Sequence, residues 1–205
     1  MRTIAKYLIG ALFFLAALVF LGWYFLPAAF DFSGPHQLHR QRAYIQNQAL
    51  LQALGSEDSN LDLEETIQAS LQFTTGHLEP GLYHNTSLIF SDPRPGNCIE
   101  YSHLFAQVFN LLATKNGLNH RAYIIRSNAR FLGMRIPLPG FADHDWVFVG
   151  ELPLDAPNKA ARIQELIESD SNMNRYVDAM FYDAFFRWNV EMSLQQEGTT
   201  VINLK

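Results

Sequence analysis

The chain has 205 residues and a mass of 23.4 kDa, enough for one domain of ordinary size and a short additional segment. Apolar residues make up 48% and charged residues 17%, which is typical of a globular protein and excludes a disordered scaffold. The net charge of −5 has the wrong sign for neutralising a phosphate backbone, so nucleic acid is not expected as a partner. A single cysteine excludes an internal disulfide, a cysteine-rich zinc site and an iron–sulfur cluster.

Residues 7–26 form an apolar run of twenty residues without a charge, which as a helix at about 1.5 Å per residue matches a bilayer core of about 30 Å. Arg2 and Lys6 precede this run and favour the cytoplasmic side. We therefore expect residues 1–6 to be a short cytoplasmic end, residues 7–26 to be a single transmembrane anchor, and the remainder to lie outside the cytoplasm. A cleaved signal peptide is the alternative, but its apolar core is only about 7–15 residues long.

After the apolar run, residues 27–35 resemble a linker, and residues 36–54 are polar with scattered apolar positions, which predicts a juxtamembrane helix. Together they make a connecting region over residues 27–59. The main domain is expected over residues 60–205. Its first helix should begin at Asp62, because Glu65 three residues later completes a capping-box pattern, and should end near Gly76.

Residues 79–97 are rich in turn formers and predict a loop or an edge element. The clearest helix of the chain follows them. Asn97 can cap its start, Glu100 occupies the third helical position, and Gly117 marks its end. An apolar stripe at helical spacing runs along it through Tyr101, Leu104, Phe105, Val108, Leu111 and Leu112.

Beyond this helix the pattern changes to short segments rich in aromatic and branched residues, which predict strands at 121–126, 146–149 and 176–181. Apolar spacing within residues 155–174 predicts a helix inserted between the last two strands. Helices come first and strands follow, so we expect an α+β fold in which the best helix packs on one sheet face.

Cys98 lies in the first turn of the best helix, where unpaired backbone N–H groups and the positive end of the helix dipole favour a thiolate. The thiolate is the nucleophilic form, so Cys98 is the candidate nucleophile. A buried cysteine that acts only as a small apolar side chain is the competing interpretation.

Of seven histidines, His144 is the best candidate for a base, because it enters a strand in which His144, Trp146 and Phe148 share one face. Its imidazole can then project from the sheet onto the helix, beside a bulky ring. A surface histidine between Asp143 and Asp145 is the alternative. We expect His36, His39, His77 and His84 to be solvated, His103 to face away from the thiol and His120 to lie at a turn.

An imidazole base needs its second nitrogen held by a carboxylate or an amide. Asp178 is the first candidate, because it interrupts an apolar strand and is costly to bury without a partner. Asp183 and Asp155 are the alternatives. Asp145 is expected to point to the sheet face opposite His144.

Three segments in this order resemble the transglutaminase-like superfamily of papain-related folds: GNCIEYS at residues 96–102 ahead of an apolar helix, HDWV at 144–147, and VDA at 177–179. The resemblance covers roughly residues 60–185. It implies a helix bearing Cys98 packed on an antiparallel sheet bearing His144 and Asp178. It further implies Cys98 as nucleophile, His144 as general base and Asp178 as the acid that orients the imidazole.

Two features depart from the family pattern. His144 and Asp178 are 34 positions apart, where family members commonly use a short hairpin, so the inserted helix is a candidate lid or partner surface. The backbone N–H of Cys98 can donate to an oxyanion, but no motif identifies a second donor.

The resulting hypothesis is a membrane-anchored thiol acyl-transfer enzyme, either a cysteine peptidase or amidase, or a transglutaminase, acting on amide bonds outside the cytoplasm. Its partners would be a protein or peptide substrate, including cell-wall peptide, and the membrane, most simply the periplasmic side of a bacterial inner membrane. The alternative is a catalytically inactive binding or scaffold module of the cell envelope. No phosphate-binding glycine motif or metal-ligand spacing is present, so neither a cofactor nor a metal is expected.

Overall fold

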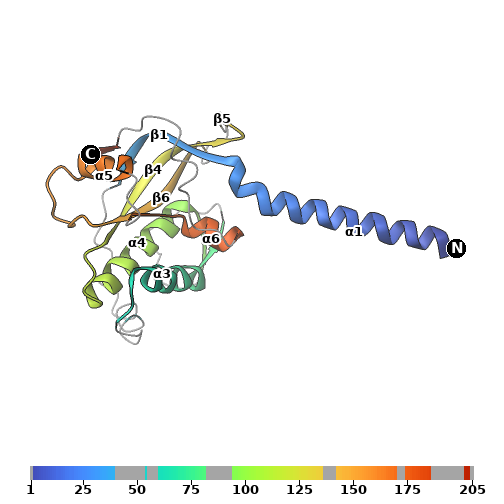
Figure 1. Cartoon of the computed structure of the whole chain (residues 1–205), viewed down its shortest axis with the longest axis horizontal. Coiled ribbons are helices and arrows are strands. Elements are labelled where there is room, and N and C mark those ends of the chain that lie inside the picture. Colours follow the sequence, from blue (N-terminus) through green and yellow to red (C-terminus); the bar gives the residue numbers. More distant parts are fainter. Residues whose placement is uncertain are drawn as a thin grey trace.

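The structure of the protein is a computed structural model in which an α+β domain carries one projecting helix (Figure 1). Within the described residues, six strands form one mostly antiparallel sheet. Their order is β7 (Arg175–Val177), β6 (Asp143–Gly150), β4 (Arg121–Phe131), β1 (Phe30–Leu38) and β8 (Val201–Asn203), with β5 (Met134–Arg135) paired to β4. The described residues are 2–39, 54, 60–81, 94–135, 142–169, 174–185 and 201–203.

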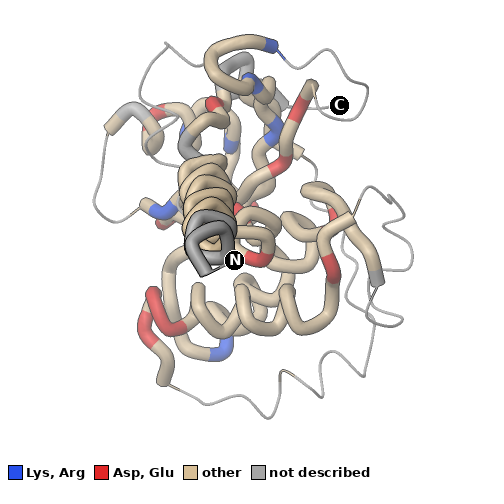
Figure 2. Tube along the Cα trace, turned by 90° about the vertical axis from the view of Figure 1, so that its right-hand side faces the viewer, with Lys and Arg blue, Asp and Glu red and all other residues tan. Residues whose placement is uncertain are grey.

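Helix α1 (Arg2–Phe25) projects away from the domain and is joined to it by the short helix η1 (Leu26–Ala29). Large apolar side chains along α1 are exposed, among them Phe13 at 74% and Phe14 at 67%. Residues 9–25 of this helix include no Lys, Arg, Asp or Glu, and the part of the helix drawn in colour in Figure 2 is accordingly tan. In the part of the chain whose side chains are described, no helix is both long and apolar enough to cross a bilayer, so the anchor predicted at residues 7–26 is not confirmed.

Strand β1 (Phe30–Leu38) replaces the linker and the beginning of the helix that the sequence predicts here. It pairs antiparallel with β4, and the register shifts between Ser33 and Gln37, where the chain contains Gly34 and Pro35. Proline removes a ladder donor and is tolerated in a strand mainly at such irregular positions. The sheet therefore reaches back to residues well before 60, whereas residues 40–53 of the predicted helix lie outside the described residues.

Strands β4 (Arg121–Phe131), β6 (Asp143–Gly150) and β7 (Arg175–Val177) form consecutive antiparallel pairs. The strands predicted at 121–126 and 146–149 are confirmed, and both are longer than expected. Strand β8 (Val201–Asn203) adds to β1 in parallel, and β5 (Met134–Arg135) turns back on the end of β4.

Two helices start where their capping boxes predict. Helix α3 (Leu63–His77) begins after Asp62, whose side chain accepts from the Glu65 N–H at 2.9 Å, and α4 (Cys98–Lys115) begins after Asn97 with the equivalent pair of bonds. Each cap satisfies donors that the first turn leaves unpaired, and contributes about 1 kcal/mol. The segment between them includes strands β2 (Leu78–Pro80) and β3 (Arg94–Gly96), which pair in parallel.

The predicted inserted helix is confirmed as α5 (Lys159–Glu168). The strand predicted at 176–181 is wrong beyond Val177, because the chain turns there into helix α6 (Ala179–Phe185). The carboxylate of Asp178 accepts from the Phe181 N–H at 2.9 Å and so caps this helix. A side chain that satisfies a helix start favours the helix over continuation of the strand.

The sheet has a buried cluster on each face. Helices α3, α4 and α6 lie on one face and α5 on the other (Figure 1). Large buried side chains contribute about 1.5–3 kcal/mol each, so both faces hold the strands in register. The α4 face buries, among others, Leu71, Leu104, Phe105, Ile124, Val147 and Val177, and the α5 face buries Phe32, Tyr123, Ile125, Trp146, Phe148 and Ile163.

Candidate active site

Cys98 is the first residue of α4, and the capping box of this helix fixes its position. The Asn97 side chain accepts from the Ile99 N–H at 2.9 Å, and the Glu100 carboxylate accepts from the Asn97 N–H at 3.1 Å. Cys98 is half-buried. The sulfur therefore lies at a helix start whose backbone donors point out of the helix, as the sequence predicts.

His144 is the second residue of β6 and lies between two aromatic rings. Its imidazole stacks on Phe32, with ring centroids 4.8 Å apart and an interplanar angle of 15°. The ring of Phe181 is tilted relative to the imidazole, and their centroids are 5.2 Å apart. Only 11% of the His144 side chain is exposed. Trp146 and Phe148 share the face of Phe32, as the alternation from His144 predicts, and they pack in the same cluster as α5. Phe32 and Phe181 are the rings in contact with the imidazole and shield it from water.

Asp178 lies between β7 and α6, and its carboxylate contacts one residue of β6 and one residue of α6. One oxygen, Oδ2, pairs with Nε2 of His144, and the other, Oδ1, accepts from the Phe181 N–H at 2.9 Å. The side chain is 1% exposed. A buried carboxylate held at both oxygens fixes the orientation of the ring that it binds.

Cys98 lies close enough to His144 for the thiol to act on the imidazole. Burial acts to lower the pKa of His144, but the charges and hydrogen bonds of Asp178 and Cys98 outweigh it and hold this pKa well above its ordinary value. The structure thus brings together the three residues that the sequence singled out, in the order Cys98, His144, Asp178.

The other candidate carboxylates lie elsewhere. Asp183 accepts a hydrogen bond from the buried Tyr101 hydroxyl, and Asp155 lies in an exposed turn. Asp145 pairs with Arg126 on the α4 face, away from the Phe32 side of the sheet. Among these aspartates, Asp178 is the one bonded to His144.

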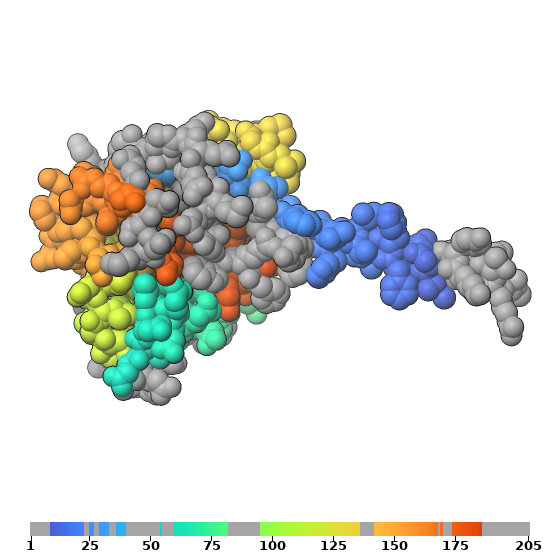
Figure 3. Space-filling model, in the orientation of Figure 1, coloured from blue at the N-terminus to red at the C-terminus, as the bar shows by residue number. Residues whose placement is uncertain are grey.

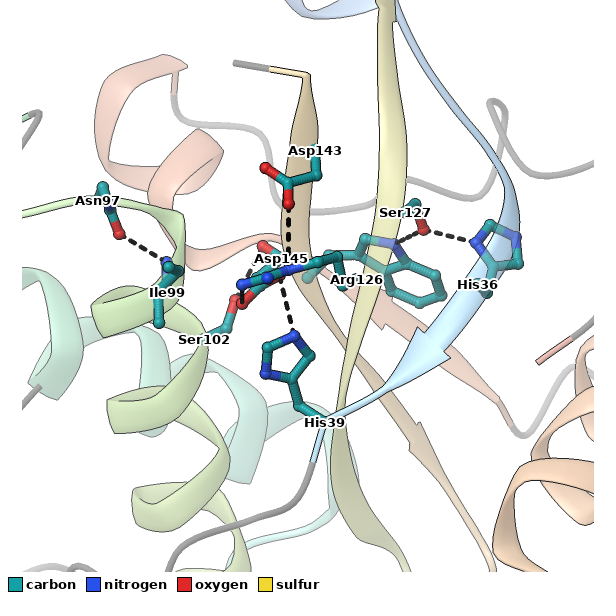
Figure 4. A network of polar contacts seen from close by, with 10 residues as sticks. His36, His39, Asn97, Ile99, Ser102, Arg126, Ser127, Asp143 and Asp145 are labelled. Carbon is teal, nitrogen blue, oxygen red and sulfur yellow. Dashed lines mark hydrogen bonds and ion pairs between the residues drawn. The ribbon is translucent and has the colours of Figure 1, made fainter. Parts of the chain in front are cut away.

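A second polar network lies between the sheet and the start of α4 (Figure 4). Arg126 donates from Nε and Nη2 to the two oxygens of Asp145, at 2.7 and 3.2 Å, and Asp143 lies 3.5 Å from Nε. Ser102 of α4 donates to the Asp145 carbonyl at 2.9 Å, which attaches the first turns of α4 to the start of β6.

The charge of Arg126 acts on the thiol end of the site. Burial acts to lower the pKa of Arg126, but Asp145, Asp143 and Cys98 together raise it. A guanidinium fixed by a buried carboxylate supplies a permanent positive charge near the sulfur. Neither the sequence spacing nor the family resemblance identifies Arg126.

Of the histidines expected in solvent, His36 is buried and His39 is half-buried. His36 is fully buried in β1, its Nδ1 lies 2.5 Å from the Ser127 hydroxyl, and burial lowers its pKa to about 4. The indole N–H of Trp146 donates to the same hydroxyl at 2.7 Å. His39 is 16% exposed and lies 3.7 Å from Asp145. Burial also lowers the pKa of His39.

The contacts described for the remaining histidines are with other residues. His103 is buried beside His39, with ring centroids 6.3 Å apart, and His120 lies 4.0 Å from Glu151. His77 is half-buried and stacks on Phe73. His84 lies outside the described residues.

Phe32 and Phe181 are the site residues that sequence reasoning misses. The sequence places Phe32 in a linker and Phe181 in a strand or a general core. The only local signal is the alternation Phe30-Asp31-Phe32, which is typical of a strand start but is interrupted by Gly34 and Pro35.

Among the described residues, no three His, Cys, Asp or Glu side chains gather in an arrangement suited to a metal ion. Comparison of the chain with family models, curated proteins and solved structures finds no match to any of them.

Proposed function

We propose that this protein is a thiol-dependent acyl-transfer enzyme of the transglutaminase-like kind, acting on amide bonds. The observation that carries the proposal is that Asp178 is hydrogen-bonded to the imidazole of His144, while Cys98 at the start of α4 lies close enough to act on the same imidazole. A sulfur, an imidazole and a carboxylate in this order are the parts of a nucleophile, a base and an orienting acid.

The proposed reaction begins when the imidazole takes the thiol proton and the Cys98 sulfur attacks the amide carbonyl carbon. A sulfur–carbon bond forms, the carbon–nitrogen bond breaks, and the protonated His144 gives its proton to the departing amine. Water or a second amine then attacks the thioester, with His144 accepting its proton, and the thiol is regenerated. Water as acceptor makes the enzyme a peptidase or amidase, and an amine makes it a transglutaminase.

The surroundings support this chemistry at two points. The backbone N–H of Cys98, at the start of α4, is placed to donate to the oxyanion that forms on the attacked carbonyl. Phe32 and Phe181 exclude water from His144, which strengthens its electrostatic coupling to Asp178.

The substrate proposed is a protein or peptide amide outside the cytoplasm, a class that includes cell-wall peptide. We further propose that α1 attaches the domain to a lipid bilayer, with the domain on the outer side of a bacterial inner membrane. The exposed apolar side chains of α1 support this, because a contiguous surface of leucine and phenylalanine side chains along one helix is costly to expose to water.

The proposal is tested by the rate at which iodoacetamide alkylates Cys98, the one thiol of the chain. We expect His144→Ala to slow alkylation by on the order of 10²-fold, since the thiol loses the group that accepts its proton. His120→Ala is the matched control, because it removes a half-buried histidine that contacts Glu151 instead, and it should label like the wild type.

Equal and slow alkylation of the wild type and His144→Ala would exclude an activated nucleophile. Full rescue of a deletion phenotype by Cys98→Ser would then favour the alternative, a tethered binding or scaffold module that has lost the reaction.

A further inference from the structure

The turn between β4 and β5 holds a leucine in an unfavourable backbone conformation. Leu132 and Gly133 are the two central residues of this hairpin, with φ of +50° and +74°. Two-residue hairpins with both φ values positive strongly prefer Asn-Gly or Asp-Gly, because side chains with a bulky Cβ substituent are strained there. Gly133 fits this preference and Leu132 does not.

The same turn exposes its apolar side chains. Leu132 and Met134 are each 65% exposed, among the highest values for large apolar residues of the domain outside α1. In water the leucine would add a hydration cost to a backbone cost and gain no packing in return. A residue that carries both costs indicates that the turn meets a partner other than water.

The turn lies where α1 leaves the domain. The Leu132 N–H donates to the Ala29 carbonyl at 2.7 Å, and Ala29 is the last residue of η1, directly after α1. Figures 1 and 3 show the hairpin (yellow) at the surface on the side from which α1 projects. Phe25, at the end of α1, is 57% exposed. The exposed apolar side chains of the turn therefore lie near the base of the exposed apolar helix.

Charge follows directly behind the apolar tip. Arg135 is exposed next to Met134 and lies opposite Arg130, which in turn lies opposite Asp31 of β1. An exposed arginine behind an apolar tip can extend to an anionic headgroup while the tip enters the acyl boundary. From its tip inward the hairpin has apolar side chains and then positive charge. This order matches a bilayer surface, in which acyl chains are followed by anionic headgroups.

We propose that the β4–β5 hairpin is a membrane-docking element that inserts Leu132 and Met134 into a bilayer containing anionic lipid. This rests on the proposed attachment of α1 to a membrane, but not on the thiol chemistry. Docking also places the candidate site beside the bilayer, because ring contacts run from Phe131 to Phe30 at 5.3 Å, from Phe30 to Phe181 at 5.4 Å and from Phe181 to His144. The substrate amide would then be one presented at the membrane surface.

The test uses the full chain with Cys98→Ser, incorporated into vesicles of phosphatidylcholine and phosphatidylglycerol. A polarity-sensitive fluorophore is attached through Met134→Cys, and lipids carrying a quencher in the acyl chain are added. Leu154→Cys is the matched control, because Leu154 is an exposed leucine at the β6–α5 connection. Phe14→Cys, on α1, reports attachment of the helix itself.

We expect strong lipid quenching at positions 14 and 134 and little at position 154, with quenching at 134 reduced in pure phosphatidylcholine. Quenching at 14 without quenching at 134 would overturn the docking element while leaving α1 attachment and the thiol chemistry untouched. Equal quenching at 134 and 154 would also overturn it.

A second variant separates docking from a structural role of the turn. Leu132→Asn gives the turn the residue type that it prefers before Gly133, so we expect it to raise the Tm and to lower quenching of the Met134→Cys probe. A lowered Tm with unchanged quenching would mean that Leu132 serves folding and would overturn the proposal.

Discussion

Two buried histidines on the same face of the sheet differ in the sign of their pKa shifts. His36 lies beside Trp146 and contacts a neutral hydroxyl, and burial lowers its pKa to about 4. His144 lies on Phe32, and burial acts in the same direction, but Asp178 and Cys98 reverse the result and raise its pKa well above the ordinary value.

The difference teaches that burial alone does not decide the charge of an imidazole in this fold. The partner atom decides it: the hydroxyl of Ser127 leaves His36 neutral and structural, whereas Asp178 and Cys98 favour the protonated form that His144 takes when it accepts the thiol proton. Each prediction below changes one partner in one of the two regions.

The largest effect is expected for Asp178→Asn, which removes the negative charge that contributes most to raising the pKa of His144. The NMR titration midpoint of His144 should fall, and alkylation of Cys98 should slow by roughly 10²-fold or more, as when an orienting carboxylate is neutralised. Asp183→Asn is the control, because Asp183 contacts Tyr101 and its loss should leave the midpoint of His144 in place. An unchanged midpoint in Asp178→Asn would remove Asp178 from the site.

The next largest effect concerns stability against pH. The pKa of His36 is about 4 in the folded chain and 6.5 when unfolded, so the unfolded state binds more protons between these values, and stability falls as the pH falls from 6.5 to 4. The loss should be about 3 kcal/mol in the free energy of unfolding. His144 acts in the opposite sense, since its raised pKa stabilises the fold below pH 6.5 and loses effect as the pH rises through the folded value.

Urea unfolding across this pH range measures the effect, and His36→Gln should flatten the slope between pH 4 and 6.5. A slope that persists in His36→Gln would assign the acid sensitivity to another group.

Ser127→Ala should cost about 2 kcal/mol of unfolding free energy, because it leaves the buried Trp146 N–H and the His36 Nδ1 without their shared partner. Alkylation of Cys98 should not change, since the network lies apart from the sulfur. Ser169→Ala is a suitable comparison, as it removes an exposed hydroxyl that bonds a helix carbonyl and should cost under about 0.5 kcal/mol. A slowed alkylation in Ser127→Ala would show that the two histidine regions are coupled.

The smallest effect is expected for Phe32→Leu, which removes the ring stacked on His144. A cation over an aromatic face contributes about 0.5–2 kcal/mol, so alkylation should slow about twofold to thirtyfold. Phe73→Leu removes a comparable stack on His77 in α3 and should leave alkylation unchanged. Equal rates in both variants would limit Phe32 to a packing role.

The sequence predicts those parts of the site that depend on local signals. Asn97 and Glu100 mark the start of α4 and so place Cys98, and alternation along 144–148 marks a strand that carries His144. Asp178 stands out because it interrupts an apolar segment. Each of these signals lies within a few residues of the group that it identifies.

What the sequence does not predict depends on partners far along the chain. Strand β1 contains Gly34 and Pro35, and it becomes a strand because β4, about ninety residues later, supplies its ladder. The burial of His36 and the stacking of Phe32 both follow from that pairing. His144 and Phe32 lie on the same face of the sheet because of the register in which their strands pair. Register is fixed by tertiary contacts rather than by local propensity.

The position of β1 in the sheet also determines where the chain can be truncated without loss of the site. Four residues of η1 separate α1 from a strand that lies between β4 and β8. A recombinant fragment starting at residue 60 would lose strand β1. It would also lose the Phe32 ring that stacks on His144, and His36, which contacts Ser127. A fragment starting at Leu26 would keep all three, so truncation immediately after α1 separates attachment from the chemistry of Cys98.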